Sequence, residues 1–229
     1  MANILPAKVI YQVSCPDPHT HRFHVRAVFP PTAGALRVKL PAWNPGSYLV
    51  RDFVSHLNFE RAEDAAGRPL SFQKDAKNAW VIAKPASGSI TVIYTVYAHE
   101  LTVRSSHLDA THAFFNGVTL FLFAEEQREL PVDLTLDLPA DWRISTGLPR
   151  VSSDGAVFRA RNYDHLVDCP VEAGHHALIE FSVNGIPHEV AIWGAGNYET
   201  SVLQHDLASV VQVASELMGG LPYERYLFI

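Results

Sequence analysis

The side chains best suited to chemistry are concentrated between Tyr163 and Gly174. This stretch holds three carboxylates, an imidazole and a thiol, on Asp164, His165, Asp168, Cys169 and Glu172. Paired carboxylates could act as a general acid and a general base if they met on one face. Pro170 opposes a continuous helix, so the spacing of four residues does not bring the acids together. We interpret Asp164 and Asp168 as groups that bond loop backbone at a domain boundary, with a catalytic role as the alternative.

Two histidine patterns were considered as metal sites, and neither satisfies the required geometry. His99-Glu100 begins like the zinc-protease motif H-E-x-x-H, but Val103 stands where the second histidine must be. The stretch also continues a predicted strand, on which residues four apart cannot share a metal ion. A second group lies near a predicted turn and consists of His19, His21 and His24. These three lack a recognisable further ligand, so we predict no metal ligand in the chain.

Nucleophilic catalysis finds equally little support in the sequence. Ser47 lies in Pro-Gly-Ser-Tyr, which is not the G-x-S-x-G elbow of serine hydrolases. Cys169 has His165 four residues before it, but buried structural cysteines are the commoner case. Gly194-Ala195-Gly196 lacks the third glycine of a dinucleotide-binding loop. We therefore assign no catalytic residue.

Composition limits the class of protein. The 229 residues are 48% hydrophobic and 18% charged, which is typical of a globular chain. A net charge of -6 gives no reason to expect nucleic acid or an anionic membrane as a partner. No apolar run approaches the ~20 residues of a membrane-spanning helix. The start of the chain has no secretory leader, and Cys15 and Cys169 do not form a disulfide framework, so we expect a cytoplasmic protein with reduced thiols.

The elements that must position these side chains are mostly β-strands. Strand patterns of period two or rich in β-branched residues cover 8–13, 22–29, 36–40, 51–59, 80–82, 90–97, 132–138, 142–146 and 157–160. Residues 60–69 are expected to be a polar turn. Phe114 to Phe123 is apolar on both faces and is predicted to be a central strand. Many short strands without a convincing helix predict an antiparallel β-sandwich or saddle-shaped sheet over residues 1–162.

Residues 163–229 are predicted to form a small α+β lobe. Asn184-Gly185 between two strand patterns predicts a hairpin. Apolar residues from Leu203 to Met218 then recur with helical spacing, and Ser201 with Gln204 resembles a capping box. Gly219-Gly220 predicts the end of this helix. Tyr226 to Ile229 reads as a strand that would normally lead into another element, so we expect the chain to continue beyond it.

Three longer motifs together resemble one family. They are Leu40-Pro41-Ala42-Trp43-Asn44-Pro45-Gly46-Ser47-Tyr48-Leu49-Val50-Arg51-Asp52-Phe53, the stretch from Tyr163 to Gly174, and Gly220-Leu221-Pro222-Tyr223-Glu224-Arg225-Tyr226-Leu227-Phe228. In this order the chain is similar to the N-terminal part of the glycyl aminopeptidase family, metallopeptidase family sixty-one. Its members are thermolysin-like zinc aminopeptidases that usually carry a PDZ domain.

The resemblance implies an N-terminal β-domain leading into a thermolysin-like zinc peptidase domain. In such enzymes two histidines of H-E-x-x-H and a later glutamate hold zinc, and a Gly-Gly-Leu-Glu-His segment holds the amino end of a peptide substrate. None of these elements is found in the 229 residues. We therefore expect a truncated, by itself non-catalytic portion that walls the active-site cleft, with zinc and the peptide substrate belonging to the full-length parent.

Motif density suggests Tyr48, Arg51 and Asp164 as candidate substrate-binding residues. An alternative is a free-standing β-sandwich that binds peptide or sugar in a cleft lined by Trp43, Tyr48 and Arg51. A purely structural or interaction domain is the third possibility. Because the last strand ends in mid-pattern, we also predict an exposed apolar surface around Leu217, Leu227 and Ile229, through which the chain could self-associate.

Overall fold

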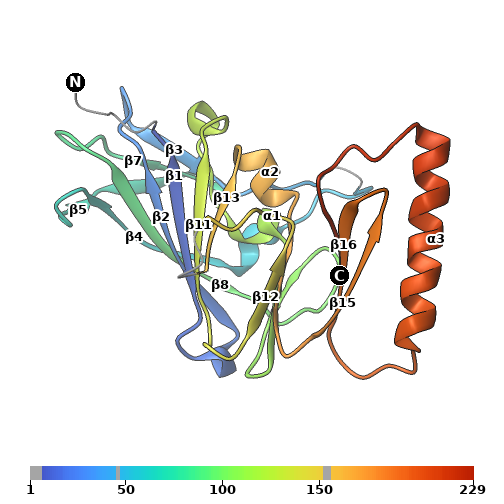
Figure 1. The fold of residues 1–229 in the computed structure, drawn as a ribbon. Helices are drawn as coiled ribbons and strands as arrows, with labels where there is room; N and C mark the ends of the chain where they lie inside the picture. Colours follow the sequence, from blue (N-terminus) through green and yellow to red (C-terminus); the bar gives the residue numbers. More distant parts are fainter. Residues whose placement is uncertain (1–6, 45–46, 152–155) are drawn as a thin grey trace.

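The computed structural model describes residues 7–44, 47–151 and 156–229. It is mainly β, as predicted, with one long helix. Figure 1 shows a group of twisted sheets at one side and a smaller lobe at the other, where α3 covers a hairpin. We call the sheets formed by β1 to β14 the β-domain, and β15, β16, β17 and α3 the C-terminal lobe. No helix in the described part of the chain is long and apolar enough to cross a membrane.

Three sheets make up the β-domain. The largest has the order β13 (Val157–Ala160), β11 (Val132–Asp137), β1 (Val9–Ser14), β2 (Arg22–Phe29), β8 (Ile90–Tyr97), β4 (Leu57–Asp64) and β5 (Pro69–Leu70). A four-stranded sheet has the order β12 (Arg143–Thr146), β14 (Val171–Gly174), β10 (His112–Phe115) and β9 (Ser106–Leu108). A three-stranded sheet has the order β3 (Leu36–Lys39), β7 (Ala79–Ile82) and β6 (Phe72–Ala76).

Pairing in the large sheet follows the sequence pattern. In β2 every second side chain is buried, whereas β8, which lies between β2 and β4 in the sheet, is buried on both faces along nearly its whole length. Strands β1 and β11 run parallel, an exception to the antiparallel pairing predicted for residues 1–162. Strands β16 and β17 of the C-terminal lobe also run parallel. The core between the sheets includes Phe23, Phe29 and Phe115, all almost fully buried.

The strand predicted at residues 51–59 and the turn predicted at 60–69 are wrong in their extent. Residues 51–59 were expected to be one strand, but the 3-10 turn η2 (Phe53–His56) precedes β4, and β4 continues to Asp64 through the segment predicted as a turn. Further short 3-10 turns are η1 (Pro18–Thr20) and η3 (Glu125–Gln127). The actual turn is four residues long because the Asp64 carboxylate accepts hydrogen bonds from the backbone N–H groups of Ala66 and Arg68.

The apolar run 118–123 is buried, but it is not a strand. After β10, the Asn116 side chain caps a single helical turn, α1 (Gly117–Leu120). The backbone carbonyls that follow would lie unpaired in the core, and three buried tyrosine hydroxyls satisfy them. These bonds run from Tyr11 to Leu122, from Tyr94 to Leu120 and from Tyr163 to Phe121, at 2.6, 2.9 and 2.8 Å. An apolar run alone does not distinguish a strand from such a buried turn.

The stretch 163–174 is more regular than predicted. It begins with one helical turn, α2 (Tyr163–Val167), capped by Asn162, and ends as strand β14. β14 lies between β10 and β12, so these residues are paired within the β-domain. The boundary predicted at residue 162, between two domains of the whole protein, therefore stays a prediction. Asp164 bonds the guanidinium of Arg128 at 2.7 Å rather than loop backbone.

The C-terminal lobe contains the predicted hairpin and helix. Strands β15 (Ala177–Val183) and β16 (Ile186–Ile192) are joined by Asn184-Gly185, whose positive φ angles of 52° and 79° fit a two-residue hairpin turn. Strand β17 (Tyr226–Phe228) pairs with β16. Helix α3 (Thr200–Met218) ends at Gly219 in the left-handed conformation, as predicted. The capping box is wrong, because Gln204 donates to the carbonyl of Glu180 on β15 instead of its own helix start.

Candidate functional site

A groove lies where the β-domain meets the C-terminal lobe. It encloses about 690 Å³ between β10 and β14 on one side and β16 and β17 on the other. Its lining is mostly apolar and includes Phe114, Val190, Ile192, Leu227 and Phe228. Its polar lining groups include Asn116, His112 and Glu172. An apolar concavity with a few polar groups is the usual form of a binding site.

The polar centre of the groove is a buried histidine–glutamate pair. Adjacent strands β10 and β14 supply it, and His112 Nε2 lies 3.0 Å from Glu172 Oε1. Both residues are almost fully buried, at 1% and 2% exposure. The His112 ring stacks on Trp193, just after β16, with the ring centres 4.1 Å apart. This contact therefore joins the β-domain to the C-terminal lobe across the groove.

A second buried histidine lies behind this pair. His176 Nε2 is 2.8 Å from Ser145 Oγ, and its Nδ1 has no hydrogen-bond partner. Burial lowers the pKa of His176 below its ordinary value, and the nearby charges of Arg143 and His112 act in the same direction. The imidazole is thus held neutral near physiological pH. No group of three or more metal-binding side chains converges around these residues in the described ranges.

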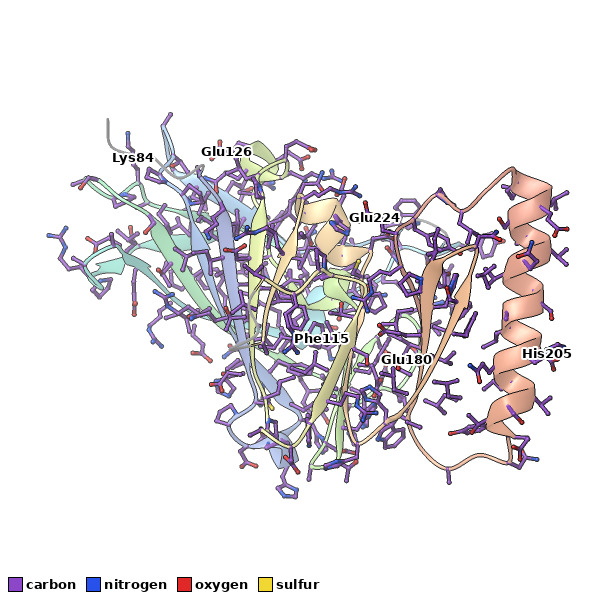
Figure 2. All side chains as sticks on the ribbon, in the orientation of Figure 1. Lys84, Phe115, Glu126, Glu180, His205 and Glu224 are labelled. Atoms are coloured by element: carbon purple, nitrogen blue, oxygen red, sulfur yellow. The ribbon has the colours of Figure 1, made fainter. Side chains whose placement is uncertain are left out.

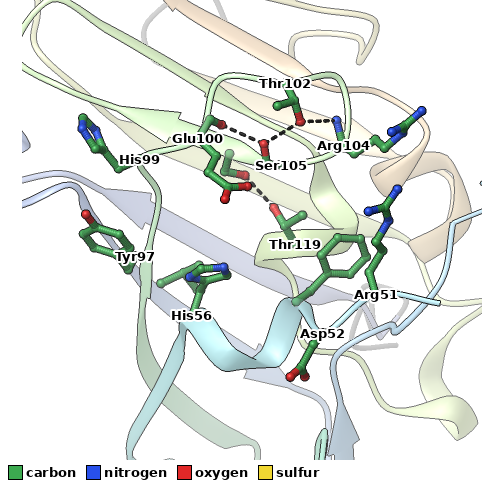
Figure 3. Close-up of a pocket in the computed structure, with 13 residues that line it drawn as sticks. Arg51, Asp52, His56, Tyr97, His99, Glu100, Thr102, Arg104, Ser105 and Thr119 are labelled. Carbon is green, nitrogen blue, oxygen red and sulfur yellow. Dashed lines mark hydrogen bonds between the residues drawn. The ribbon is translucent and has the colours of Figure 1, made fainter. Parts of the chain in front are cut away.

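A polar cavity of about 550 Å³ opens at the other side of the loop 99–105 (Figure 3). Its charged and hydrogen-bonding lining residues are Arg51, Asp52, His56, His99, Glu100, Thr102, Arg104, Ser105 and Thr119. The loop is held by its own hydroxyls: Ser105 Oγ donates to the carbonyl of Glu100, and the backbone N–H of Arg104 donates to Thr102 Oγ1. Thr102 lines both this cavity and the groove.

The three predicted binding residues do not lie together in one cavity. Tyr48 is fully exposed, at 101% of its reference area. Arg51 lines the polar cavity, and its buried Nε has no hydrogen-bond partner. Asp164 lines a different cavity and is paired with Arg128. Their role in substrate binding stays a prediction.

The other sequence candidates have structural explanations. His99 forms an isolated β-bridge with His107, and Val103 lies within the turn 102–105, so the two are not on a helix. No group of three or more metal-binding side chains converges in the described ranges. Burial raises the pKa of the Cys169 thiol to about 11, with Asp168 adding to the shift, so the reactive thiolate is scarce at neutral pH. Ser47 Oγ donates to the carbonyl of Leu49 and lacks a neighbouring base in the described part.

Sequence reasoning missed the pair that centres the groove. His112 and Glu172 are 60 residues apart, and only the pairing of β10 with β14 brings them together. Glu172 belongs to the acidic stretch singled out in the sequence, but all four residues of β14 are buried, so the local pattern gives no sign that Glu172 faces His112.

Comparison with known proteins agrees with this architecture. Residues 10–175 match the family of the peptidase M61 N-terminal domain. The structure of an aminopeptidase N family protein from Idiomarina loihiensis superimposes with a TM-score of 0.91 and 36% identity, over 96% of this chain and 38% of that chain. The present chain thus spans well under half the length of that relative. No match was found among curated proteins.

More distant structures share the fold. An M1 zinc metallopeptidase from Deinococcus radiodurans has a TM-score of 0.59 at 12% identity, over 97% of this chain and 55% of that one. Leukotriene A4 hydrolase from Saccharomyces cerevisiae has a TM-score of 0.58 at 8% identity, over 97% and 37% of the two chains. At these identities the likeness concerns the fold alone. The extended family match and the 36% identical relative decide the assignment: the chain belongs to the peptidase M61 N-terminal domain family.

Proposed function

We propose that this chain is the N-terminal portion of a zinc-dependent aminopeptidase, and that the groove forms one wall of its substrate cleft. The observation that carries the proposal is the position of the groove, between a domain of peptidase-family fold and a lobe that continues the same fold in an aminopeptidase-family relative. Its apolar lining and its single buried polar pair suit a peptide backbone with small side chains.

The portion is proposed to be non-catalytic by itself. Within the described residues, no set of His, Cys, Asp or Glu side chains converges as a metal site requires. Zinc, where the whole protein binds it, would polarise the scissile carbonyl and activate water. The residues described here would contribute shape and exclusion of water to that cleft, with His112 and Trp193 fixing the two walls relative to each other.

The proposed substrates are peptides with glycine or alanine at the amino terminus, and the proposed compartment is the cytoplasm. Both rest on the family resemblance. The test compares the 229-residue chain with the protein encoded by its complete reading frame, using glycyl and alanyl anilides with and without a chelator. We expect chelator-sensitive hydrolysis by the complete protein and none by the 229-residue chain.

Two outcomes would contradict the proposal. Metal-dependent turnover by the 229 residues alone would show that catalytic groups lie within them. A complete protein that binds no zinc and hydrolyses no amino-terminal residue would rule out the aminopeptidase.

A second candidate is a free-standing peptide- or sugar-binding module. The loop around Trp43 favours it, because Trp43 and Tyr48 are 49% and 101% exposed on an irregular segment. The Trp43 indole N–H donates to the carbonyl of Ser47, which holds the ring to its own loop. Binding of a sugar or peptide that is lost in Tyr48→Ala, with no peptidase activity in the complete protein, would favour this function.

A further inference from the structure

The polar cavity is lined by two arginines and two carboxylates, Asp52 and Glu100, but neither arginine forms an ion pair in the described residues. Six other arginines, Arg37, Arg61, Arg68, Arg128, Arg159 and Arg225, each form an ion pair with a carboxylate. In the described part of the chain, Arg51 and Arg104 form no such pair, although both line the same cavity. Figure 3 shows the Arg51 side chain directed toward the end of the cavity where Arg104 lies.

Arg51 is the more constrained of the two. It is half-buried, and its Nε is shielded from solvent without a hydrogen-bond acceptor. A buried N–H group without an acceptor destabilises the fold, and a charged donor does so more strongly than a neutral one. Its backbone N–H donates to the carbonyl of Ala42 at 2.7 Å, which fixes where the side chain begins. The Nε–H group is therefore placed in advance for an acceptor that the described residues do not supply.

The opposite side of the cavity limits what that acceptor can be. Glu100 is exposed on the loop and, within the described ranges, has no cationic partner. A carboxylate at that place repels a dianion and accepts hydrogen bonds from N–H groups. Phe53 and Tyr97 provide apolar wall. The cavity thus suits a ligand with one planar, singly charged anionic end and N–H donors beside it, as in a peptide carboxyl terminus or an acidic side chain.

The cavity and the groove lie on either side of loop 99–105. Leu101, Thr102 and Val103 of this loop line the groove, while Thr102 and Arg104 line the cavity. A peptide that follows the groove would reach this loop. We propose that Arg51 and Arg104 form a carboxylate-binding site for the peptide substrate, which deepens the proposed function and rests on it.

The test measures binding to the 229-residue chain directly, without metal or turnover. N-acetyl-glycyl-glycine, which carries a free carboxylate, is titrated against its carboxamide by NMR. We expect the carboxylate to bind about tenfold more tightly than the carboxamide, as a charge-assisted bidentate contact would give. Arg104→Gln and Arg51→Gln should each weaken carboxylate binding about tenfold and leave carboxamide binding unchanged.

Arg26→Gln is the matched control, because Arg26 lies on β2, is not part of the cavity lining, and bonds Gln12 and Thr91 through its side chain. It removes the same charge and should leave binding unchanged. Arg104 is exposed, so Arg104→Gln keeps the test valid if Arg51→Gln fails to fold. Three outcomes would each overturn the proposal. They are equal affinity for carboxylate and carboxamide, an equal loss of carboxylate binding in Arg26→Gln, and tighter binding of inorganic phosphate than of the carboxylate. Because this test measures binding and not activity, its result does not depend on the outcome of the peptidase assay.

Discussion

The β-domain and the C-terminal lobe differ in how completely they bury their apolar side chains. In the β-domain the core residues Phe23 and Phe115 are 0% and 1% exposed. On α3 only Val211 and Ser215 are buried, whereas Val213 and Leu217 remain 64% and 82% exposed. Figure 2 shows Phe115 among dense side chains and His205 of α3 directed away from the sheet. The β-domain thus carries a core of its own, while the lobe buries one narrow face of its helix.

The largest effect is expected from a cavity in the β-domain core. Phe115→Ala removes a ring that packs edge-on against Phe23 and Phe121, with ring centres 5.4 and 6.1 Å apart. We expect the free energy of unfolding to fall by about 3–5 kcal/mol. Leu217→Ala on α3 is the matched control and should change it by less than about 0.5 kcal/mol. Urea denaturation followed by circular dichroism measures both, and similar losses would refute the contrast between the two regions.

Some elements of the two regions can be predicted from the local sequence, and others cannot. Where burial alternates, as in β2, or where a strong turn such as Asn184-Gly185 stands between strands, the local pattern is enough. The error at 118–123 has another cause. Its carbonyls are satisfied by tyrosines from distant strands, one of them Tyr11, and the local sequence carries no sign of those partners.

The candidate site was less predictable than the fold. The family motif includes the loop that contains Arg51, but the unpaired Nε of Arg51 can be recognised only when its surroundings are known. His112 and Glu172 come from separate strands, and their pairing depends on register across the sheet. Pairs of this kind need tertiary structure, because neither residue has a spacing relation to the other along the chain.

The next effect concerns the contact between the two regions. Glu172→Ala leaves the buried imidazole of His112 without its carboxylate, and it also removes the pair that holds the ring against Trp193. We expect a loss of about 2–3 kcal/mol in the free energy of unfolding. Glu172→Gln keeps a hydrogen-bonding group of the same shape and should lose less. If both variants unfold at the wild-type urea concentration, the pair does not support the contact.

A smaller effect is expected on the pH dependence of the free energy of unfolding, through the buried His176. The folded protein lowers the pKa of His176 below the ordinary value of about 6.5, so the unfolded chain binds this proton more readily. The contribution of His176 to the free energy of unfolding is fully present at a pH above the ordinary pKa of 6.5. It is lost as the pH falls toward the lower pKa of the folded protein.

The groups around His176 make it suitable for this test. Ser145, Glu172, His112 and Arg143 face it. His176→Gln does not titrate, so its free energy of unfolding should fall less between pH 7 and 5 than that of the wild type. Chemical denaturation at several pH values measures the difference. A variant that loses stability as steeply as the wild type would assign the pH dependence to other histidines.

The smallest effect is expected on the exposed face of the C-terminal lobe. Leu217 and Ile229 are 82% and 50% exposed, whereas Leu227, predicted to share their surface, is half-buried and lines the groove. An exposed apolar side chain such as Leu217 favours weak association between copies of the chain. Sedimentation velocity should show an average mass that rises with protein concentration. Leu217→Lys should weaken this association about tenfold, whereas His205→Lys, which adds a similar charge to another exposed position of α3, should leave it nearly unchanged. A chain that stays monomeric at every concentration would show that apolar exposure on the lobe, in contrast to burial in the β-domain, has no consequence for assembly.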